Sequence, residues 1–282
     1  MRAEQFTDIV TGHGEGPVWL PGRGLHCVDM DNGHVLRLAD DGTVEQRLHV
    51  GAIAAVVRPR VSGGTVIAAE RHLVLLDDAG NREDLPEVFA DSSVRFNDGG
   101  CDPDGAFYCG TMAYDQAPGR GRLFRFAADG TPEVVLPSVT VSNGFWFSPD
   151  GSLAYYNDTP THHVDVFDWS PETGLTERRH FAAIDPDDGS PDGLTVDADG
   201  YVWVACWGGS AVRRFAPDGR LDEVIEVPAT QVSSCTLGGP TGDTLYITTS
   251  REGLSDAEAG LAGALFVVER AAPAQAVLPA RI

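Results

Sequence analysis

The sequence predicts an all-β protein folded as a six-bladed β-propeller, built as a single domain over residues 1–282. Two observations predict this fold: a repeated pair of short strands joined by a glycine turn, and the near absence of helical periodicity. Three segments align without gaps, and each has a polar residue eight positions before the glycine of an Asp-Gly turn: residues 97–110, 143–156 and 192–205. Fainter copies cover residues 15–29, 55–69 and 234–248, which makes six copies in all.

The length of the repeat predicts four strands in each copy. Dividing 282 residues by six gives 47 residues per unit. Each copy supplies two strands, and further strands are expected in the segments between copies, at residues 34–42, 73–80, 122–130, 164–174 and 211–219. Four short strands in a unit of this length are typical of a propeller blade. Only residues 255–264 suit a short helical turn.

The composition excludes several classes of function. The chain has 42 acidic and 20 basic residues, and its formal charge of −22 repels nucleic-acid phosphates and anionic membranes. We therefore expect neither a nucleic acid nor a membrane as a partner. Every basic residue is arginine, which excludes a Schiff-base lysine and a P-loop lysine. The pair His162–His163 follows a turn-like segment, and we interpret it as an exposed loop or outer-strand feature rather than a pair of ligands.

The cysteines and the N-terminus predict a cytoplasmic protein. The five cysteines are odd in number, form no C-x-x-C motif, and mostly lie among apolar neighbours. We therefore expect buried free thiols rather than disulfides, zinc ligands or a nucleophile. No basic start followed by an apolar run is seen at the N-terminus, and no segment is apolar for long enough to cross a membrane.

The repeat places polar residues at equivalent positions, just before the innermost strands. These strands begin near the central channel of a propeller, so the side chains there line the mouth of the channel. The residues at these positions are Glu15, Asn97, Asn143, Asp192 and Ser234. Any one of them could simply form a turn or cap a loop. Two carboxylates and two amides in register favour instead a site for a hard divalent cation such as Ca²⁺, Mg²⁺ or Mn²⁺.

Several motifs resemble one known family. They include GEGPVW, RFNDGGCDPDGAFYCGTM, SNGFWFSPDG, PDGLTVDADGYVWVACWGG and SSCTLGG, in that order and over nearly the whole chain. Together they are similar to the family of regucalcin (senescence marker protein), gluconolactonases and luciferin-regenerating enzyme. The resemblance implies a six-bladed propeller and a metal-dependent hydrolase that opens a sugar lactone to the sugar acid.

The resemblance also implies a metal site. Its ligands would be the glutamate of GEGPVW, the asparagine of SNG and the aspartate of PDG, which are Glu15, Asn143 and Asp192. One divalent ion is expected, with Ca²⁺, Zn²⁺, Mn²⁺ and Mg²⁺ all open. Such an ion polarises the lactone carbonyl and activates water. Asp192 is the expected catalytic residue, because it is the best candidate to take or pass the proton of that water.

The substrate-binding residues implied by the resemblance come from one region of the chain. Arg95 and Asn97, from the R-x-N-D-G motif, would hold the hydroxyls of the sugar lactone. Asp115, with Tyr114 beside it, would line the pocket shortly after GTM. The family commonly has lysine where this chain has Gly100, and whether the change alters the rim of the pocket stays open.

Two other functions stay open at this point. One is a calcium-binding regulatory protein without turnover, because propellers often serve as interaction platforms. The other is a different metal-dependent hydrolase, such as one with phosphotriesterase-like activity. An arginine beside the metal favours the lactonase over the regulatory protein. The sequence names neither the sugar, nor the physiological metal, nor the oligomeric state.

Overall fold

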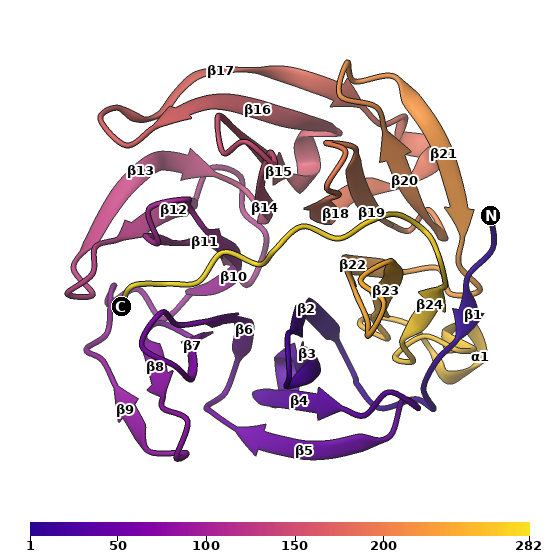
Figure 1. Cartoon of the computed structure of the whole chain (residues 1–282), viewed down its shortest axis with the longest axis horizontal. Helices are drawn as coiled ribbons and strands as arrows, with labels where there is room; N and C mark the ends of the chain where they lie inside the picture. The colour runs from indigo at the N-terminus through magenta and orange to yellow at the C-terminus, as the bar shows by residue number, and fades with distance from the viewer.

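The computed structural model describes residues 1–282, and its strands form six four-stranded sheets arranged around a common axis (Figure 1). The sheets follow one another in chain order around the ring, except that the last sheet also takes up the first strand. This arrangement confirms the predicted six-bladed β-propeller. Each copy of the repeat begins inside the innermost strand of one sheet and not just before it, because every inner strand starts at least one residue earlier than the turn spacing predicts.

Neighbouring strands within every sheet are antiparallel. From the axis outwards, the first three sheets consist of β2 (Gly14–Leu20), β3 (Gly24–Asp29), β4 (His34–Leu38) and β5 (Val44–His49); β6 (Ala54–Pro59), β7 (Thr65–Ala69), β8 (Leu73–Leu76) and β9 (Arg82–Asp84); and β10 (Val94–Cys101), β11 (Phe107–Ala113), β12 (Gly121–Phe126) and β13 (Pro132–Val139). The other three consist of β14 (Ser142–Phe147), β15 (Leu153–Asp158), β16 (His163–Ser170) and β17 (Gly174–Ala183); β18 (Ser190–Val196), β19 (Val202–Trp207), β20 (Ala211–Phe215) and β21 (Leu221–Glu226); and β22 (Val232–Gly238), β23 (Thr244–Thr249), β24 (Phe266–Val268) and β1 (Glu4–Gln5).

The helical segments are few and short. They are the 3₁₀ turns η1 (Met30–Asn32), η2 (Thr159–Thr161) and η3 (Pro186–Asp188), and the single α-helical turn α1 (Asp256–Ala259). The turn α1 lies within the predicted helical segment, and a capping box between Ser255 and Glu258 satisfies backbone and side-chain donors at its start. None of the helices is both long and apolar enough to span a bilayer.

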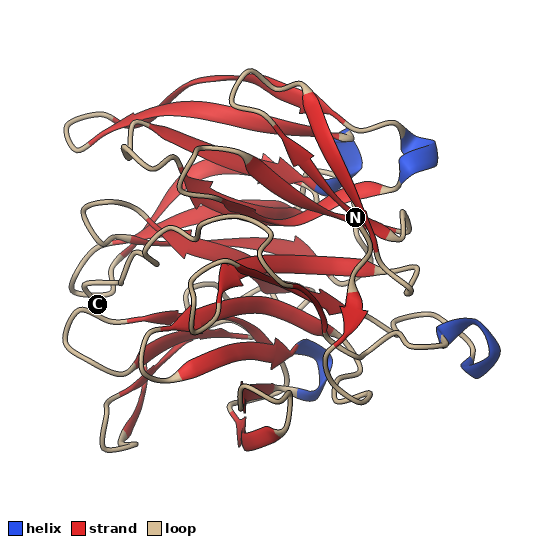
Figure 2. Cartoon of the chain, turned by 45° about the vertical axis from the view of Figure 1, so that its right-hand side comes forward, coloured by secondary structure: helices blue, strands red, loops and turns tan.

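The two ends of the chain both contribute to closing the propeller. Strand β1 pairs with β24, so that the N-terminal segment supplies the outermost strand of the last blade. The C-terminal segment, yellow in Figure 1, crosses one face of the propeller, where Ala274 bridges to Asp197 and Ala280 bridges to Arg60. Figure 2 shows the C-terminus on one side and the short helical segments on the other. The C-terminal segment therefore leaves the face that carries η2 uncovered.

The core lies between adjacent blades. Trp203 of β19, for example, is completely buried and belongs to one apolar cluster with Cys235 and Ile247 of the sixth blade. The second blade packs in the same way, with Val56 and Ile67 completely buried. Burial of this kind needs a neighbour on both sides, because one blade alone leaves both faces of its sheet in water.

All six inner strands share one irregularity. Each has a register shift against its neighbour, located between Glu15 and Val18, Ala54 and Val56, Phe96 and Gly99, Asn143 and Phe145, Pro191 and Leu194, and Val232 and Ser234. A β-bulge bends its strand and redirects the side chains beside it. In five of the six inner strands the bulge therefore occurs at or beside the polar residue of the repeat, and it changes the direction in which that side chain points.

Candidate active site

A cavity with a volume of about 90 Å³ lies at the axis, on the face that carries η2. It has room for a cation and several waters. Glu15, Asn97, Asn143 and Asp192 line it, as the repeat predicts, and so does Arg95. The other lining residues are His13, Met112, Gln116, Val141, Thr159, Pro160, Trp207 and Glu252. The structure thus brings together five of the residues predicted for metal and substrate binding, although they come from four different blades.

A chain of hydrogen bonds orients one side of the cavity. Arg95 Nη1 donates to Asn97 Oδ1 at 2.6 Å, and Asn97 Nδ2 donates to Asn143 Oδ1 at 3.0 Å. Asn143 Nδ2 in turn donates to Thr159 Oγ1 at 2.8 Å. Arg95, Asn97 and Asn143 are each about 95% buried, so water competes little for these hydrogen bonds. The bonds direct the oxygen of Asn143 into the site and leave it a lone pair, since a carbonyl oxygen has two.

The opposite side of the cavity carries unbalanced negative charge. Glu15 and Asp192 are both buried, and burial followed by the charge of Asp98 raises the pKa of Glu15 to about 7. Burial, then Glu15 and Asp98, raise the pKa of Asp192 well above its ordinary value. Asp98 itself lies 3.8 Å from Arg58 Nη2, which offsets part of its own charge. Nearby carboxylates that destabilise one another in this way are the arrangement that a bound cation relieves.

The donor set fits the implied divalent metal ion. Two carboxylates and one amide oxygen are hard ligands, and they face the same small cavity. Glu15 accepts only its neighbouring Gly16 N–H, at 2.8 Å, and therefore keeps lone pairs for a cation. We infer that Glu15, Asn143 and Asp192 would hold the ion.

Glycine next to the site residues allows the close packing around the axis. A Cβ on Gly193 would lie 2.0 Å from Ser234 Oγ and 2.8 Å from Ser234 Cα. Gly16 has a φ of 50°, which disfavours other residues. The Asp-Gly and Glu-Gly pairs of the motifs are therefore explained by the bulges, where the backbone of one inner strand approaches the next blade.

Four residues singled out in the sequence lie outside the lining of the cavity. Asp115 is exposed, and its carboxylate accepts the N–H of Ala117. Tyr114 is 47% exposed, donates to Glu70 at 2.6 Å and places its ring 5.9 Å from the guanidinium of Arg95.

Ser234 and Gly100 are the other two. Ser234 packs against Gly193, while Gly100 lies inside β10, where a Cβ would come 2.6 Å from the carbonyl oxygen of Phe145. Glycine at position 100 therefore belongs to the packing of β10 against β14 and does not form the rim of the cavity.

A second group of residues at the cavity, centred on His13, was not predicted from the sequence. His13 Nδ1 lies 3.3 Å from Asp31 Oδ2 and 3.4 Å from Glu252 Oε2, while its ring packs against Trp207 with centroids 5.6 Å apart. In the sequence, only its position two residues before Glu15 could have indicated that His13 lines the cavity. Asp31 and Glu252 belong to connections between strands, and the repeat does not predict where side chains in these connections point.

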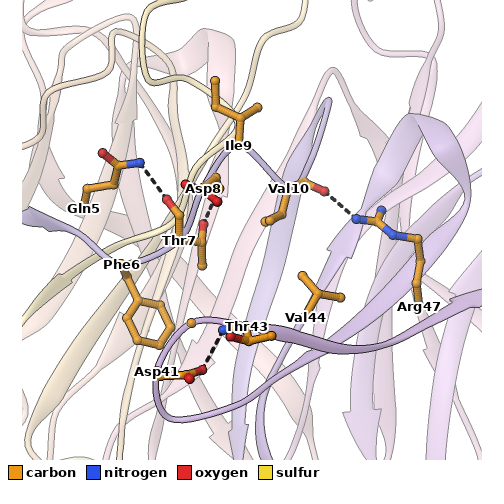
Figure 3. Close-up of a pocket in the computed structure, with 11 residues that line it drawn as sticks. Gln5, Phe6, Thr7, Asp8, Ile9, Val10, Asp41, Thr43, Val44 and Arg47 are labelled. Carbon is orange, nitrogen blue, oxygen red and sulfur yellow. Dashed lines mark hydrogen bonds between the residues drawn. The ribbon is translucent and has the colours of Figure 1, made fainter.

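A wider hollow lies elsewhere, between the segment Gln5–Val10 and the connection around Asp41–Val44 (Figure 3). Its volume is about 730 Å³. Its polar groups bond mainly to one another: Arg47 Nη2 donates to Val10 O at 2.8 Å, and the Thr43 N–H donates to Asp41 at 2.9 Å. It has no buried group of carboxylates, so the smaller axial cavity is the better candidate for an active site.

Comparison with known proteins gives the same assignment as the motifs. The family model described as the SMP-30/Gluconolactonase/LRE-like region matches residues 13–251. A pentonolactonase of Haloferax volcanii is 36% identical, with 96% of each chain covered. An L-arabinolactonase of Azospirillum brasilense is 35% identical, covering 95% of this chain and 92% of the relative, and a regucalcin of Danio rerio is 34% identical, covering 87% and 85%.

Solved structures of the same family have the same fold. A luciferin-regenerating enzyme superposes with a TM-score of 0.88 at 26% identity, with 96% of each chain covered. A calcium-binding protein, regucalcin, from Agrobacterium tumefaciens gives a TM-score of 0.85 at 27% identity, with 95% of each chain covered. The axial cavity with its carboxylates, the motifs and these relatives agree, and the chain belongs to the SMP-30/gluconolactonase/LRE-like family.

Proposed function

We propose that this protein is a metal-dependent lactonase that hydrolyses an aldonolactone to the sugar acid. The observation that carries the proposal is the placement of Glu15, Asn143 and Asp192 on one axial cavity, directly beside Arg95 and Asn97. Relatives named pentonolactonase and L-arabinolactonase support it. They also make pentonolactones the first substrates to test.

The chain's own residues divide the chemistry between them. A bound divalent cation supplies a Lewis acid for the carbonyl and for water. Asp192, held against the cavity by its position on the bulge of β18, takes the proton of the attacking water. Arg95 offers directed donors to the ring hydroxyls of the substrate. Asn97 holds Arg95 and Asn143 in place through two of its three side-chain hydrogen bonds, the third being to the carbonyl oxygen of Ser142.

The charges that line the cavity balance once the cation is bound. The lining contains Glu15, Asp192 and Glu252 against the single arginine Arg95. A divalent cation would supply the remaining positive charge, so a neutral lactone would enter a site without a large net charge. A cytoplasmic location stays a prediction, for which the buried free cysteines are the support.

The experiment is a panel of pentono- and hexonolactones, with a phosphotriester included, followed by acid release in the presence of each divalent metal. We expect turnover of at least one lactone by the wild-type protein and its loss in Asp192→Asn. Asp187→Asn, an exposed carboxylate in the connection before β18, is the matched control. Calcium binding without turnover of any lactone would favour the regulatory alternative, to which the relatives named regucalcin point.

A further inference from the structure

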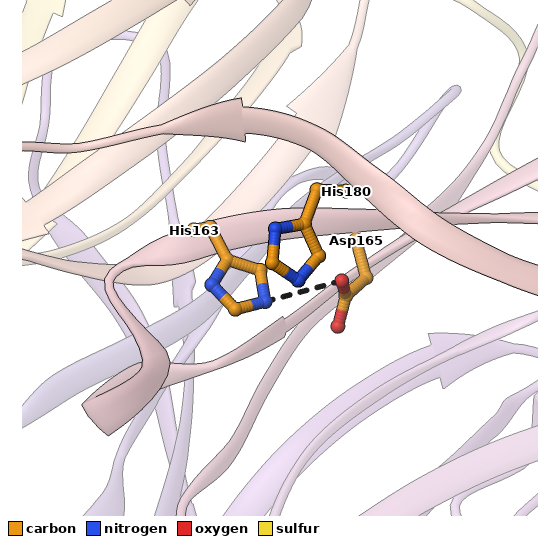
Figure 4. A group of neighbouring side chains, drawn as sticks. All are labelled: His163, Asp165 and His180. Carbon is orange, nitrogen blue, oxygen red and sulfur yellow. Dashed lines mark ion pairs between the residues drawn. The ribbon is translucent and has the colours of Figure 1, made fainter.

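A second group of possible metal ligands lies on the outer half of the fourth blade. His163 and Asp165 are two residues apart on β16, and side chains at that spacing share a face of a strand. Asp165 stands directly opposite His180 of β17 in the register of the two strands. Figure 4 shows the two imidazole rings side by side, with the carboxylate of Asp165 next to them.

The distances between the donor atoms suit one small cation. His163 Nε2 lies 3.2 Å from Asp165 Oδ1, and one donor atom from each of the three residues lies within 4.8 Å of the others. Zinc bonds of 2.0–2.2 Å place tetrahedral ligand atoms about 3.4 Å apart. The rings of His163 and His180 are stacked with centroids 3.7 Å apart. Because the lone pairs of stacked rings lie in nearly parallel planes, one ring has to turn for both nitrogens to reach the same ion, and the exposed position of His180 leaves it room to do so.

The hydrogen bonds around the group leave one lone-pair atom of each residue available as a metal ligand. His163 Nδ1 lies 2.8 Å from the carbonyl oxygen of Thr161, and because a carbonyl only accepts, Nδ1 carries the proton. A neutral ring then presents the lone pair of Nε2 to Asp165 Oδ1, which is also an acceptor. Arg178 Nε and Nη2 donate to the other oxygen of Asp165, at 2.8 and 2.6 Å. Two acceptors that face each other need a proton or a cation between them, and backbone-anchored histidines are typical of metal sites.

We propose that His163, Asp165 and His180 form a second metal site, selective for a borderline cation such as Zn²⁺. Two imidazoles and one carboxylate prefer Zn²⁺, Co²⁺ or Ni²⁺ to Ca²⁺ or Mg²⁺, in contrast to the all-oxygen ligands at the axis. A water would complete the tetrahedron on the exposed side of His180. Arg178 positions the carboxylate and limits the affinity through its positive charge.

The site is linked to the axial cavity through one short segment. Thr159 and Pro160 of η2 line that cavity, and the carbonyl of Thr161 in the same turn is bound by His163. A cation at His163 would therefore fasten the end of the segment that positions Thr159 against Asn143. A cation at His163 would restrain this segment whether or not a metal is bound at the axis and whether or not substrate is turned over.

Cobalt binding tests the proposal, because the visible absorption of Co²⁺ reports nitrogen ligands. Wild-type protein and the variant His163→Asn/His180→Asn are dialysed against Co²⁺ in an excess of Mg²⁺, and the bound cobalt is counted. We expect one equivalent fewer in the double variant, with loss of the nitrogen-ligand absorption. Zn²⁺ at about a hundred times its Kd for this site should raise the melting temperature of the wild type by about 5 °C more than that of the double variant, which keeps the axial site.

Three further variants make the result specific. His72→Asn removes another surface histidine whose Nε2 also lies 3.2 Å from a carboxylate, that of Asp84, with no second imidazole there, and it should keep the cobalt. Asp192→Asn should keep it as well, since it alters only the axial site. His180→Asn alone, at an exposed position, guards against misfolding of the double variant. Equal cobalt content and absorption in the wild type and both His180 variants would overturn the proposal.

Discussion

Replacement of Arg95 by methionine tests the assignment of the substrate-binding side of the cavity. The side chain is 5% exposed, and its Nη1 donates to Asn97 Oδ1 at 2.6 Å and to the carbonyl oxygen of Phe96 at 3.0 Å. Methionine keeps most of the volume but removes every donor. A hydrogen bond from a charged group contributes about 1.5–3 kcal/mol, so kcat/KM should fall about tenfold to 150-fold.

The assay measures lactone hydrolysis and bound metal on the same sample. Metal content should stay near that of the wild type, because Glu15, Asn143 and Asp192 are unchanged. Arg120→Met removes an exposed arginine that pairs with Asp91 and should leave both quantities unaltered. Unchanged kcat/KM in Arg95→Met would refute a role in substrate binding. A parallel loss of metal would instead assign Arg95 to the support of Asn97 and Asn143.

Three further outcomes are expected. In thermal melts of the metal-free protein, the stability of the fold should fall as the pH rises from about 4.5 to about 7. The reason is that the raised pKa of Glu15 keeps a proton on the folded state that the unfolded state has lost, and a bound divalent cation should abolish this pH dependence. Gly193→Ala should destabilise by about 1–3 kcal/mol in urea unfolding, because the new methyl would overlap Ser234, whereas Gly51→Ala, with its nearest atom 3.9 Å away, should change little. Reducing agent should leave the melting temperature unchanged and alkylation of the folded protein should be slow, because all five thiols are buried and burial raises the pKa of Cys109; a fall in melting temperature on reduction would contradict this.

The repeat made the fold and the axial residues predictable. The spacing between a polar residue and the following Asp-Gly turn is fixed by the length of one strand, so Asn143 and Asp192 could be placed on the axis from sequence alone. The closure of the ring could not, because the pairing of Glu4 with Val267 joins distant segments without a repeat between them. The bulges could not be predicted either, although the glycine that follows Glu15, Asn143 and Asp192 marks three of them.

Residues in connecting segments were harder to predict. Asp115 and Gln116 are neighbours in one turn, and only Gln116 lines the cavity, because its φ of 54° turns the backbone there. His13 and Glu252 meet across 239 residues of sequence, counted from their numbers. His163 lies at the start of an outer strand, as its pattern predicts, but its partner is the cross-strand His180 and not the adjacent His162. Contacts of these kinds depend on tertiary packing and leave no period in the sequence.

In the proposed mechanism, binding of one axial cation and lactone turnover depend on each other. The most direct measurement is a titration of rigorously metal-free protein with Mn²⁺, recording bound metal and the rate of aldonolactone hydrolysis together. The rate should rise from the background in proportion to bound Mn²⁺ and reach its plateau at one equivalent, and Asp192→Asn should neither bind the ion tightly nor turn over substrate. Full activity before any Mn²⁺ is added, or tight binding of Mn²⁺ without any gain in rate, would show that turnover does not depend on the axial ion.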